Sequence, residues 1–313
     1  MPELPPESVI LWKYLDPTTR SSLYARCRQG TLVKLHRGAY VESHLWQDLD
    51  EDARHRARSL AVALHLGDET VFSHLSAAAL WRLPRVGRWP ERPHIAGPRG
   101  GGGSESTVFV RHAFGVPDRV ETIDGLNVTT LATTVVDVAS TTGFAHAVVV
   151  ADAALRRNLH PIPGVPQTQL SRADLLDELS RISLRHGARR AGSVIDFADG
   201  RADRPGESMS RVNMDLAGIT QPELQVPMLG ASGKAYDVDF WWPQFNVIGE
   251  FDGKYKYTDP RYMSGRTAEQ VLYDEKLRED DLRAAQHGFT RWPWATAVSP
   301  TLLRAHLARA GVR

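Results

Sequence analysis

The sequence has only one cysteine, Cys27, among its 313 residues. A single cysteine excludes an internal disulfide framework and is typical of proteins from reducing compartments. Cys27 stands between Arg26 and Arg28 in a helical pattern, where a thiol usually serves packing. We therefore do not expect it to be a nucleophile.

A hydrophobic segment long enough to cross a membrane is also missing. The longest apolar run, from Phe144 to Leu155, is interrupted by His146 and Asp152, and a spanning helix needs about 20 apolar residues. The first residues, MPELPP, lack the basic and then apolar order of a signal peptide. We expect a cytoplasmic protein that has no membrane partner.

Neither sign of charge is in large excess, since 38 basic residues meet 37 acidic ones for a net charge of +1. The distribution along the chain is uneven. From residue 13 to residue 37 the basic residues are Lys13, Arg20, Arg26, Arg28, Lys34 and Arg37, and the one acid is Asp16. Acids gather later, at 48–52 and 237–252. A basic head followed by an acid-rich site suits a phosphate backbone as partner.

A chain of 313 residues exceeds one ordinary hydrophobic core and should form two or three domains. The order of expected helices and strands favours an α/β (α+β multidomain) fold. We place a head at 1–45, a mixed α/β middle domain at 46–160, a linker with a helix at 161–200 and a last domain at 201–313.

The head shows the outline of a winged helix. We expect a first helix from Ser8 to Tyr14 and a second one that begins after Asp16 and stops at Gly30, because Asp caps helices and Gly ends them. The next segment, 31–41, alternates apolar and basic residues around a glycine turn, which is typical of a short β-wing.

The middle of the chain is expected to contain both helices and strands. Helices are predicted at 50–66, at 73–80 with Ser73 as the cap, at 131–155 and at 172–197. The glycine run at 97–104 should be a loop or hairpin turn between strands at 94–96 and 108–110, and the proline-rich segment 160–166 a linker. A polar break at 200–206 opens the last domain.

Acidic residues of the last domain fall on a predicted β-hairpin, with strands before and after Pro243 and Asn246. Side chains alternate between the faces of a strand. Asp237 and Asp239 should therefore share one face of the first strand. The second strand should place on one face Glu250, Asp252 and Lys254.

A turn centred between residues 244 and 245 would set Asp239 opposite Glu250 and Asp237 opposite Asp252. Like charges facing each other across a sheet are destabilising, whereas oxygen ligands suit Mg²⁺ or Mn²⁺. Lys254 could then orient or deprotonate a water molecule. The alternative is that these acids form an ordinary solvated face, with the apolar residues turned to the core.

An acid on one strand followed by (D/E)-x-K on its antiparallel neighbour resembles the PD-(D/E)xK, restriction-endonuclease-like superfamily. The very-short-patch-repair-like branch is most similar, since its Asp-Phe, turn, Glu-x-Asp-Gly order stands here as Asp239-Phe240 and 250–253. Such proteins tend to place a glutamate on the preceding helix, here Glu207, and a charged helix and a strand afterwards, here 273–283 and 288–292.

One position departs from that pattern. Asp252 stands where the lysine is expected, and Lys254 follows two residues later. The unit could instead be Asp252-Gly253-Lys254 with Glu250 as an extra ligand, or the lysine could come from the next helix as Lys276. The expected site has Asp239, Glu250 and Asp252 holding Mg²⁺ or Mn²⁺, Glu207 assisting and Lys254 acting on the attacking water.

The head and middle resemble AbiEi-type antitoxins, on the segments 30–41, 73–80 and 126–137. The resemblance implies a DNA-binding winged helix, with a possible cognate toxin or a second copy of the chain as further partner. A winged helix places its second helix in the major groove while cations of the wing meet phosphate. The expected DNA contacts are Arg20, Arg26, Arg28, Lys34 and Arg37.

Three other motifs are rejected on their chemistry. Ser73 and His74 should not form a hydrolase dyad, because neighbours on a helix point apart and Ser73 suits a cap. The glycines at 100–103 lack the Lys-Ser/Thr of a P-loop. Zinc-ligand spacing is absent among His36, His44, His55 and His65.

Two functions follow as expectations. The first is a DNA-binding protein with a Mg²⁺-dependent endonuclease domain that hydrolyses phosphodiester bonds. The second is an AbiEi-like antitoxin or transcriptional repressor whose nuclease fold has no catalytic activity.

Overall fold

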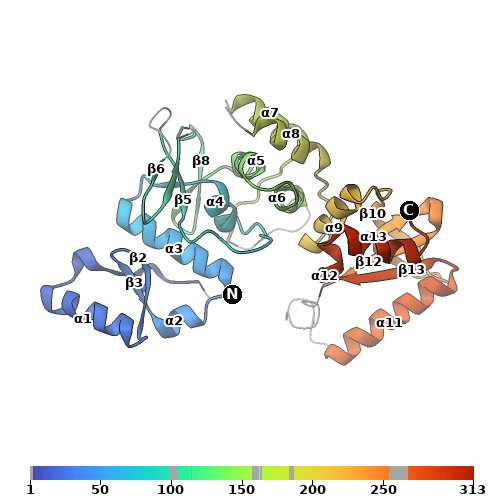
Figure 1. Ribbon diagram of the computed structural model, residues 1–313, viewed down its shortest axis with the longest axis horizontal. Coiled ribbons are helices and arrows are strands. Elements are labelled where there is room, and N and C mark those ends of the chain that lie inside the picture. The colour runs from blue at the N-terminus through green and yellow to red at the C-terminus, as the bar shows by residue number, and fades with distance from the viewer. Residues whose placement is uncertain are drawn as a thin grey trace. The chain divides into compact units, whose positions relative to one another are not determined.

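The computed structural model describes residues 3–98, 104–113, 115–156, 162, 164–182, 187–253 and 267–313. The chain forms a mixed α/β fold in two compact units, Met1–Ala198 and Asp199–Arg313 (Figure 1). The N-terminal unit spans the expected head, middle region and linker. Lys254 and part of the expected linker lie outside the described residues.

The head is built on a three-stranded sheet of order β1-β3-β2, with β1 at Ile10–Leu11, β2 at Leu32–His36 and β3 at Ala39–Glu42. The predicted helix from Ser8 to Tyr14 was wrong. That segment holds β1 between two short 3-10 turns, η1 (Pro6–Ser8) and η2 (Trp12–Tyr14). So short a segment gains little as an isolated helix, whereas pairing with β3 satisfies its backbone.

The second predicted helix of the head is confirmed as α1, Pro17–Arg28. The Asp16 side chain accepts hydrogen bonds from the backbone N–H groups of Thr18 (2.9 Å) and Thr19 (3.1 Å), and the chain leaves the helix through Gly30 at φ +74°. Leu23 is its one fully buried residue. Most of the α1 surface is therefore open to a partner.

The hydrophobic core of the head continues into helix α3 (Glu51–Leu66), which follows the short helix α2 (Ser43–Gln47). Residues from β1, β2 and β3 pack against three alanines of α3, Ala53, Ala57 and Ala61, which lie on one face of the helix. Head and middle region thus share one core.

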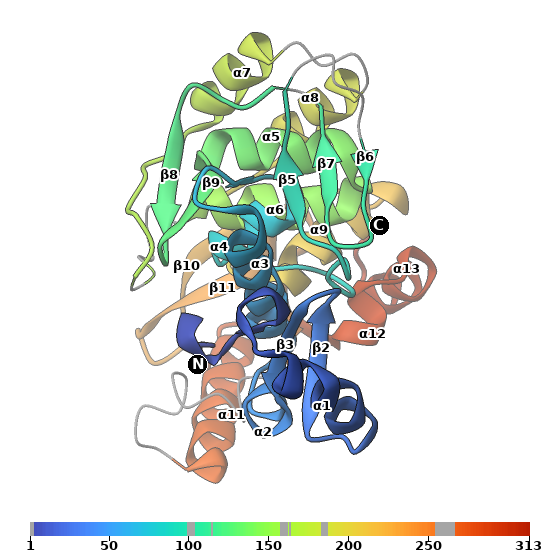
Figure 2. The same ribbon diagram turned by 90° about the vertical axis from the view of Figure 1, so that its left-hand side faces the viewer.

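A six-stranded sheet of order β6-β7-β5-β4-β9-β8 forms the middle of this unit, and Figure 2 looks onto its strands. The strands are β4 (Val71–Phe72), β5 (His94–Ala96), β6 (Ser104–Glu105), β7 (Val110–His112), β8 (Val120–Ile123) and β9 (Leu126–Thr129). Because β5 and β7 pair in parallel, the glycine-rich segment between them does not close a hairpin of these two strands.

The other described helices of this unit are α4 (His74–Leu80), α5 (Leu131–Thr141), α6 (Phe144–Arg156), α7 (Arg172–Arg181) and α8 (Ala188–Phe197). The predicted single helix at 172–197 is thus two helices. Among residues with assigned positions, no helix combines the length and apolarity that a membrane crossing requires.

The C-terminal unit carries a four-stranded sheet of order β10-β11-β12-β13, in which β13 runs parallel to β12 and the other pairs are antiparallel. In chain order its elements are α9 (Pro205–Leu216), β10 (Glu223–Leu229), β11 (Ala235–Trp242), the 3-10 turn η3 (Pro243–Phe245), β12 (Val247–Asp252), α11 (Ala268–Ala284), β13 (Gly288–Pro293), α12 (Trp294–Ala297) and α13 (Pro300–Arg309).

Two apolar cores form on this sheet. One contains Phe240, Trp242 and Trp292 with Met214 of α9 and Leu303 of α13. The other contains Val238, Ile248 and Phe289 with Leu282 of α11. These packing partners identify an α9 face and an α11 face of the sheet.

Candidate functional site

The predicted acidic hairpin is confirmed as β11 and β12. Its register pairs Phe240 with Gly249, Trp241 with Ile248 and Trp242 with Val247, which is the register expected from a turn centred between residues 244 and 245. Pro243 starts the connecting 3-10 turn and Asn246 closes it at φ +50°.

The regular ladder breaks at Asp239. The pairs of β10 with β11 run on either side of Gln225 and Asp239 but omit them, and Gln225 has φ +51°. Val238 packs in the α11-face core and Phe240 in the α9-face core, although residues two apart share a face in a regular strand. Such a local interruption of the ladder redirects a side chain.

The carboxylate of Asp239 is held between β12, β10 and α9. Its Oδ2 accepts a hydrogen bond from the Phe251 N–H at 3.0 Å. The Gln225 side-chain amide lies 3.4 Å from Asp239 Oδ1 and 3.1 Å from Glu207 Oε2. One amide group therefore contacts both carboxylates and fixes them next to each other.

Glu207 is almost completely buried, at 1% exposure, in the first turn of α9. Its Oε2 also accepts a hydrogen bond from the Asp203 N–H at 2.8 Å. Burial and then the negative charge of Asp239 raise the pKa of Glu207 well above its usual range. Two acids this close are stable only if they share a proton or a cation.

Glu250 has different partners. It is 2% exposed, and its two carboxylate oxygens lie 2.7 Å from Arg278 Nη1 on α11 and 3.0 Å from Arg291 Nη2 on β13. Arg291 also lies 3.4 Å from Glu275. Glu250 therefore belongs to a buried ion-pair network of α11 and β13.

The expected convergence of Asp239 and Glu250 on one side of the hairpin is thus wrong. The two residues are opposite each other in the register, but the interruption of the β10–β11 ladder turns Asp239 toward α9 and Glu207, while Glu250 turns toward α11. Within the part of the chain with described positions, no group of three or more His, Cys, Asp or Glu side chains could hold a metal ion.

The remaining predicted residues lie around this site. Asp237 is exposed, and its backbone carbonyl accepts a hydrogen bond from Arg278. Asp252 is half-buried at the end of β12, and Lys276 is exposed on α11. Lys254 lies outside the described residues.

Of the expected DNA contacts of the head, two cations interact with other groups of the head and three have exposed side chains. Arg26 forms a 2.6 Å ion pair with Glu42, and Arg20 donates hydrogen bonds to the carbonyl oxygens of Trp12 and Lys13, both at 3.1 Å. Exposed side chains are presented by Arg28, Lys34 and Arg37.

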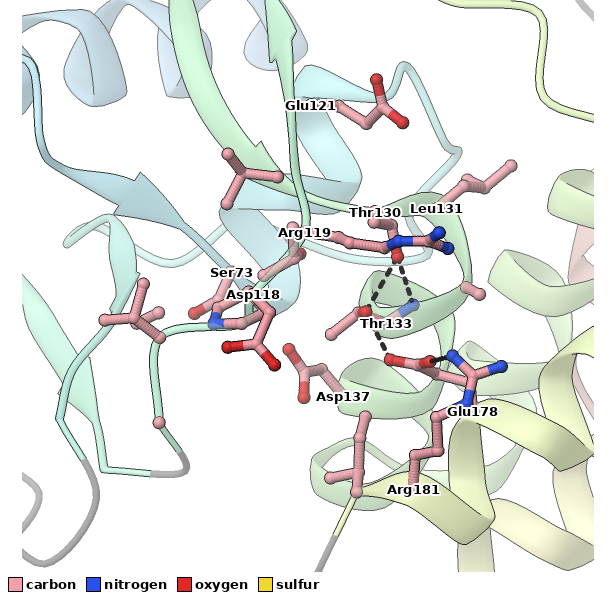
Figure 3. Close-up of a pocket in the computed structure, with 18 of the residues that line it drawn as sticks. Ser73, Asp118, Arg119, Glu121, Thr130, Leu131, Thr133, Asp137, Glu178 and Arg181 are labelled. Atoms are coloured by element: carbon pink, nitrogen blue, oxygen red, sulfur yellow. Dashed lines mark hydrogen bonds and ion pairs between the residues drawn. The ribbon is translucent and has the colours of Figure 1, made fainter.

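A pocket of about 1290 Å³ in the N-terminal unit was not predicted from the sequence (Figure 3). Its lining includes Ser73 and His74 at the start of α4, Thr133 and Asp137 of α5 and Glu178 of α7. Thr133 donates a hydrogen bond to Glu178 at 2.6 Å. The one available signal was Asp137, an acid within the apolar helix pattern of 131–141.

Ser73 and His74 behave differently from the prediction. The Ser73 side chain makes no capping hydrogen bond and lies 3.0 Å from His74 Nδ1. The residues point together because His74 has φ +52°. Asp137 Oδ2 lies 3.4 Å from that same nitrogen, whereas a catalytic relay uses one ring nitrogen for each partner. We therefore still reject a hydrolase dyad of Ser73 and His74, because of this geometry and not because the two side chains point apart.

Further histidines lie next to this group: His74 is buried, and His94 and His112 are half-buried. His112 stacks on His74 with ring centroids 3.6 Å apart, and His112 Nε2 lies 3.2 Å from His94 Nδ1. Burial, and then the neighbouring His112 and His94, hold the pKa of His74 well below its usual range. Burial also lowers the pKa of His94 to about 3 and that of His112 to about 4. Burial also raises the pKa of Asp137 to about 7.

Comparison with known proteins gives relatives but no family. No family model matches the chain. Two proteins of Mycobacterium tuberculosis, from strains CDC 1551 and H37Rv, are each 28% identical to it over 280 residues, which covers 86% of this chain and 95% of the relative; both are named only as uncharacterised proteins. A match of this length includes parts of both units, so the chain is similar to proteins that combine them.

Proposed function

We propose that the chain is a DNA-binding protein whose C-terminal unit hydrolyses phosphodiester bonds with the help of Mg²⁺ or Mn²⁺. The observation that carries this proposal is the carboxylate pair of the buried Glu207 and the half-buried Asp239, joined by the amide of Gln225. A divalent cation bound by oxygen ligands would relieve the repulsion within this pair.

The residues that fit the ion are Glu207 and Asp239. Asp252, at the end of the adjacent strand β12, follows Phe251 of the α9-face core and therefore turns to the opposite face. Glu250 fits less well than expected, because Arg278 and Arg291 already neutralise its charge. The ion would activate water and stabilise charge on the phosphate. Gln225 and the Phe251 N–H hold Asp239 in place, and Lys254 is proposed to take the proton of the attacking water.

The order of elements also supports the proposal. The resemblance implied a helix with a glutamate, an acidic hairpin, a charged helix and a strand. The C-terminal unit contains α9 with Glu207, the β11–β12 hairpin, α11 and β13 in that order. In the head, the exposed cations Arg28, Lys34 and Arg37 are available to phosphate groups.

The direct test is cleavage of DNA by the purified full chain with Mg²⁺ or Mn²⁺. We expect nicking or cutting, and loss of it in Asp239→Ala. Asp237→Ala is the matched control on the same strand, because the side chain of Asp237 is exposed and its contact with Arg278 uses the backbone. Absence of cleavage of every DNA and RNA form tested would end the enzyme proposal.

A second candidate is a DNA-binding regulator, such as an AbiEi-like antitoxin or repressor, with a nuclease fold that does not cleave. The observation that favours it is the ion pairing of Glu250, which withdraws one expected ligand from the site. This candidate predicts DNA binding by the full chain without any cleavage.

A further inference from the structure

Exposed aromatic rings alternate with cations along one side of the head. Trp12 is 46% exposed and Tyr24 is 74% exposed. On α1 the residues Arg20, Tyr24 and Arg28 follow one another at intervals of four, which places them on one face of the helix. We call Trp12, Arg20, Tyr24 and Arg28 the aromatic stripe.

Each arginine of the stripe makes a cation–π contact with one of its rings. The Arg20 guanidinium carbon lies 4.1 Å from the centre of the Trp12 ring, and the same side chain donates hydrogen bonds to the carbonyls of Trp12 and Lys13. The Arg28 guanidinium carbon lies 5.9 Å from the Tyr24 ring centre. Such contacts orient a ring without burying it.

A third exposed ring continues this arrangement. Tyr14 is 76% exposed, and Lys13 Nζ lies 4.9 Å from the centre of its ring. The Lys13 amine also donates a hydrogen bond to the carbonyl of Leu64 at the end of α3, which ties this part of the head to its core. Three large rings on one small domain are thus open to solvent and next to positive charge.

We propose that the aromatic stripe binds single-stranded DNA by stacking unpaired bases on Tyr24 and Trp12. This inference rests on the proposed DNA binding of the head and names the form of DNA that it takes. The stripe offers the two kinds of contact that bind a single strand: aromatic rings on which bases stack, and arginines that contact the phosphates between the bases.

Duplex DNA would not use these rings in the same way. In a duplex the faces of the bases are already stacked, and a protein reaches mainly their edges in the grooves. Arginines alone would serve a duplex backbone equally well. The exposure of these rings, from 46% at Trp12 to 76% at Tyr14, is explained by a partner that offers free base faces.

The test measures the fluorescence anisotropy of a labelled oligothymidylate and of a duplex of the same length, with the full chain and EDTA to prevent cleavage. The single strand should bind more tightly. Tyr24→Ala should weaken single-strand binding by about tenfold or more without changing its salt dependence, and Tyr24→Phe should retain it. Tyr273→Ala, which removes a tyrosine 63% exposed on α11, is the matched control.

Two results would overturn the inference, and they differ in what else they affect. Duplex binding that equals or exceeds single-strand binding, with no loss in Tyr24→Ala, would remove the stacking role and leave the DNA-binding proposal standing. No binding of either form would remove the proposed DNA binding together with this inference. Arg28→Ala should flatten the salt dependence if phosphate contacts exist.

Discussion

Three buried carboxyl groups in this protein meet three different environments. Asp137 lies in an apolar helix beside neutral histidines, Glu207 lies beside a second acid, and Glu250 lies between two arginines. The first two environments favour the protonated acid, whereas the third favours the carboxylate. The same chemical group therefore serves different purposes at these three positions.

The pKa of Asp137 gives a pH dependence of stability. Its pKa rises from 3.8 to about 7 on folding, so the folded state holds a proton that the unfolded state releases between these values. The free energy of unfolding should fall from about pH 4 to about pH 7 through this group and level off above. Asp137→Asn should remove this contribution, because an amide does not titrate in this pH range. The side-chain oxygen of asparagine can still accept the hydrogen bond from the backbone N–H of His74.

Chemical denaturation of both proteins across this pH range checks the prediction. The variant should gain stability relative to the parent as pH rises toward 7. Parallel curves for the two proteins would contradict the raised pKa of Asp137.

The carboxylates of the C-terminal unit should differ in their effect on stability. Glu250→Gln leaves Arg278 and Arg291 without their buried counter-charge and should lower the free energy of unfolding by about 3 kcal/mol. Glu207→Gln keeps a hydrogen-bond acceptor and removes an unfavourable charge, so stability at neutral pH should stay equal or rise. Equal losses in both variants would contradict the separate environments that we assign.

At the residue scale the sequence named the acids of the proposed site but did not predict their partners. Asp239 and Glu207 were named from the hairpin pattern and the resemblance. Gln225 was not, because its contact with two carboxylates depends on an interruption of the β10–β11 ladder. Arg278 and Arg291 were missed because they reach Glu250 from elements well separated in the sequence.

At the scale of elements, local chemistry was enough wherever a turn or a cap decides the structure. The β11–β12 register follows from Pro243 and Asn246, and α1 follows from Asp16 and Gly30. The sequence did not reveal strand β1 within the segment 8–14, because its partner β3 lies some thirty residues away. The interruption at Asp239 likewise depends on β10, which a hairpin pattern alone does not reveal.

Replacing Gly249 tests how closely strand β12 packs against the tryptophan rings of the α9-face core. A Cβ atom at this position would lie 2.7 Å from the Trp242 ring and 2.8 Å from the Trp292 ring. Gly249→Ala should therefore lower the free energy of unfolding by about 1–3 kcal/mol. Thermal denaturation measures the loss.

Gly192→Ala is the control for this substitution. Its nearest neighbour, Leu179, lies 4.0 Å away, and Gly192 is inside helix α8, so alanine should raise stability by about 0.5–1 kcal/mol. If both alanines proved equally harmless, the close packing of Gly249 against the tryptophans would be wrong.

At the scale of the whole molecule, the chain joins an N-terminal unit that presents exposed cations and rings to a C-terminal unit in which the buried Glu207 lies beside Asp239. The sequence placed the last domain at 201–313, and the C-terminal unit begins at Asp199. The relatives from Mycobacterium tuberculosis are similar over a length that reaches both units. We propose that one unit brings nucleic acid to the chemistry of the other.

The most direct test of this account is a calorimetric titration of the full chain with Mn²⁺, in the parent protein, in Asp239→Asn and in Glu250→Gln. We predict that the parent binds the ion, that Asp239→Asn loses binding and that Glu250→Gln, if folded, retains it. No heat of binding in the parent protein, or equal binding in parent and Asp239→Asn, would contradict the assignment of Glu207 and Asp239 as the ion-holding pair.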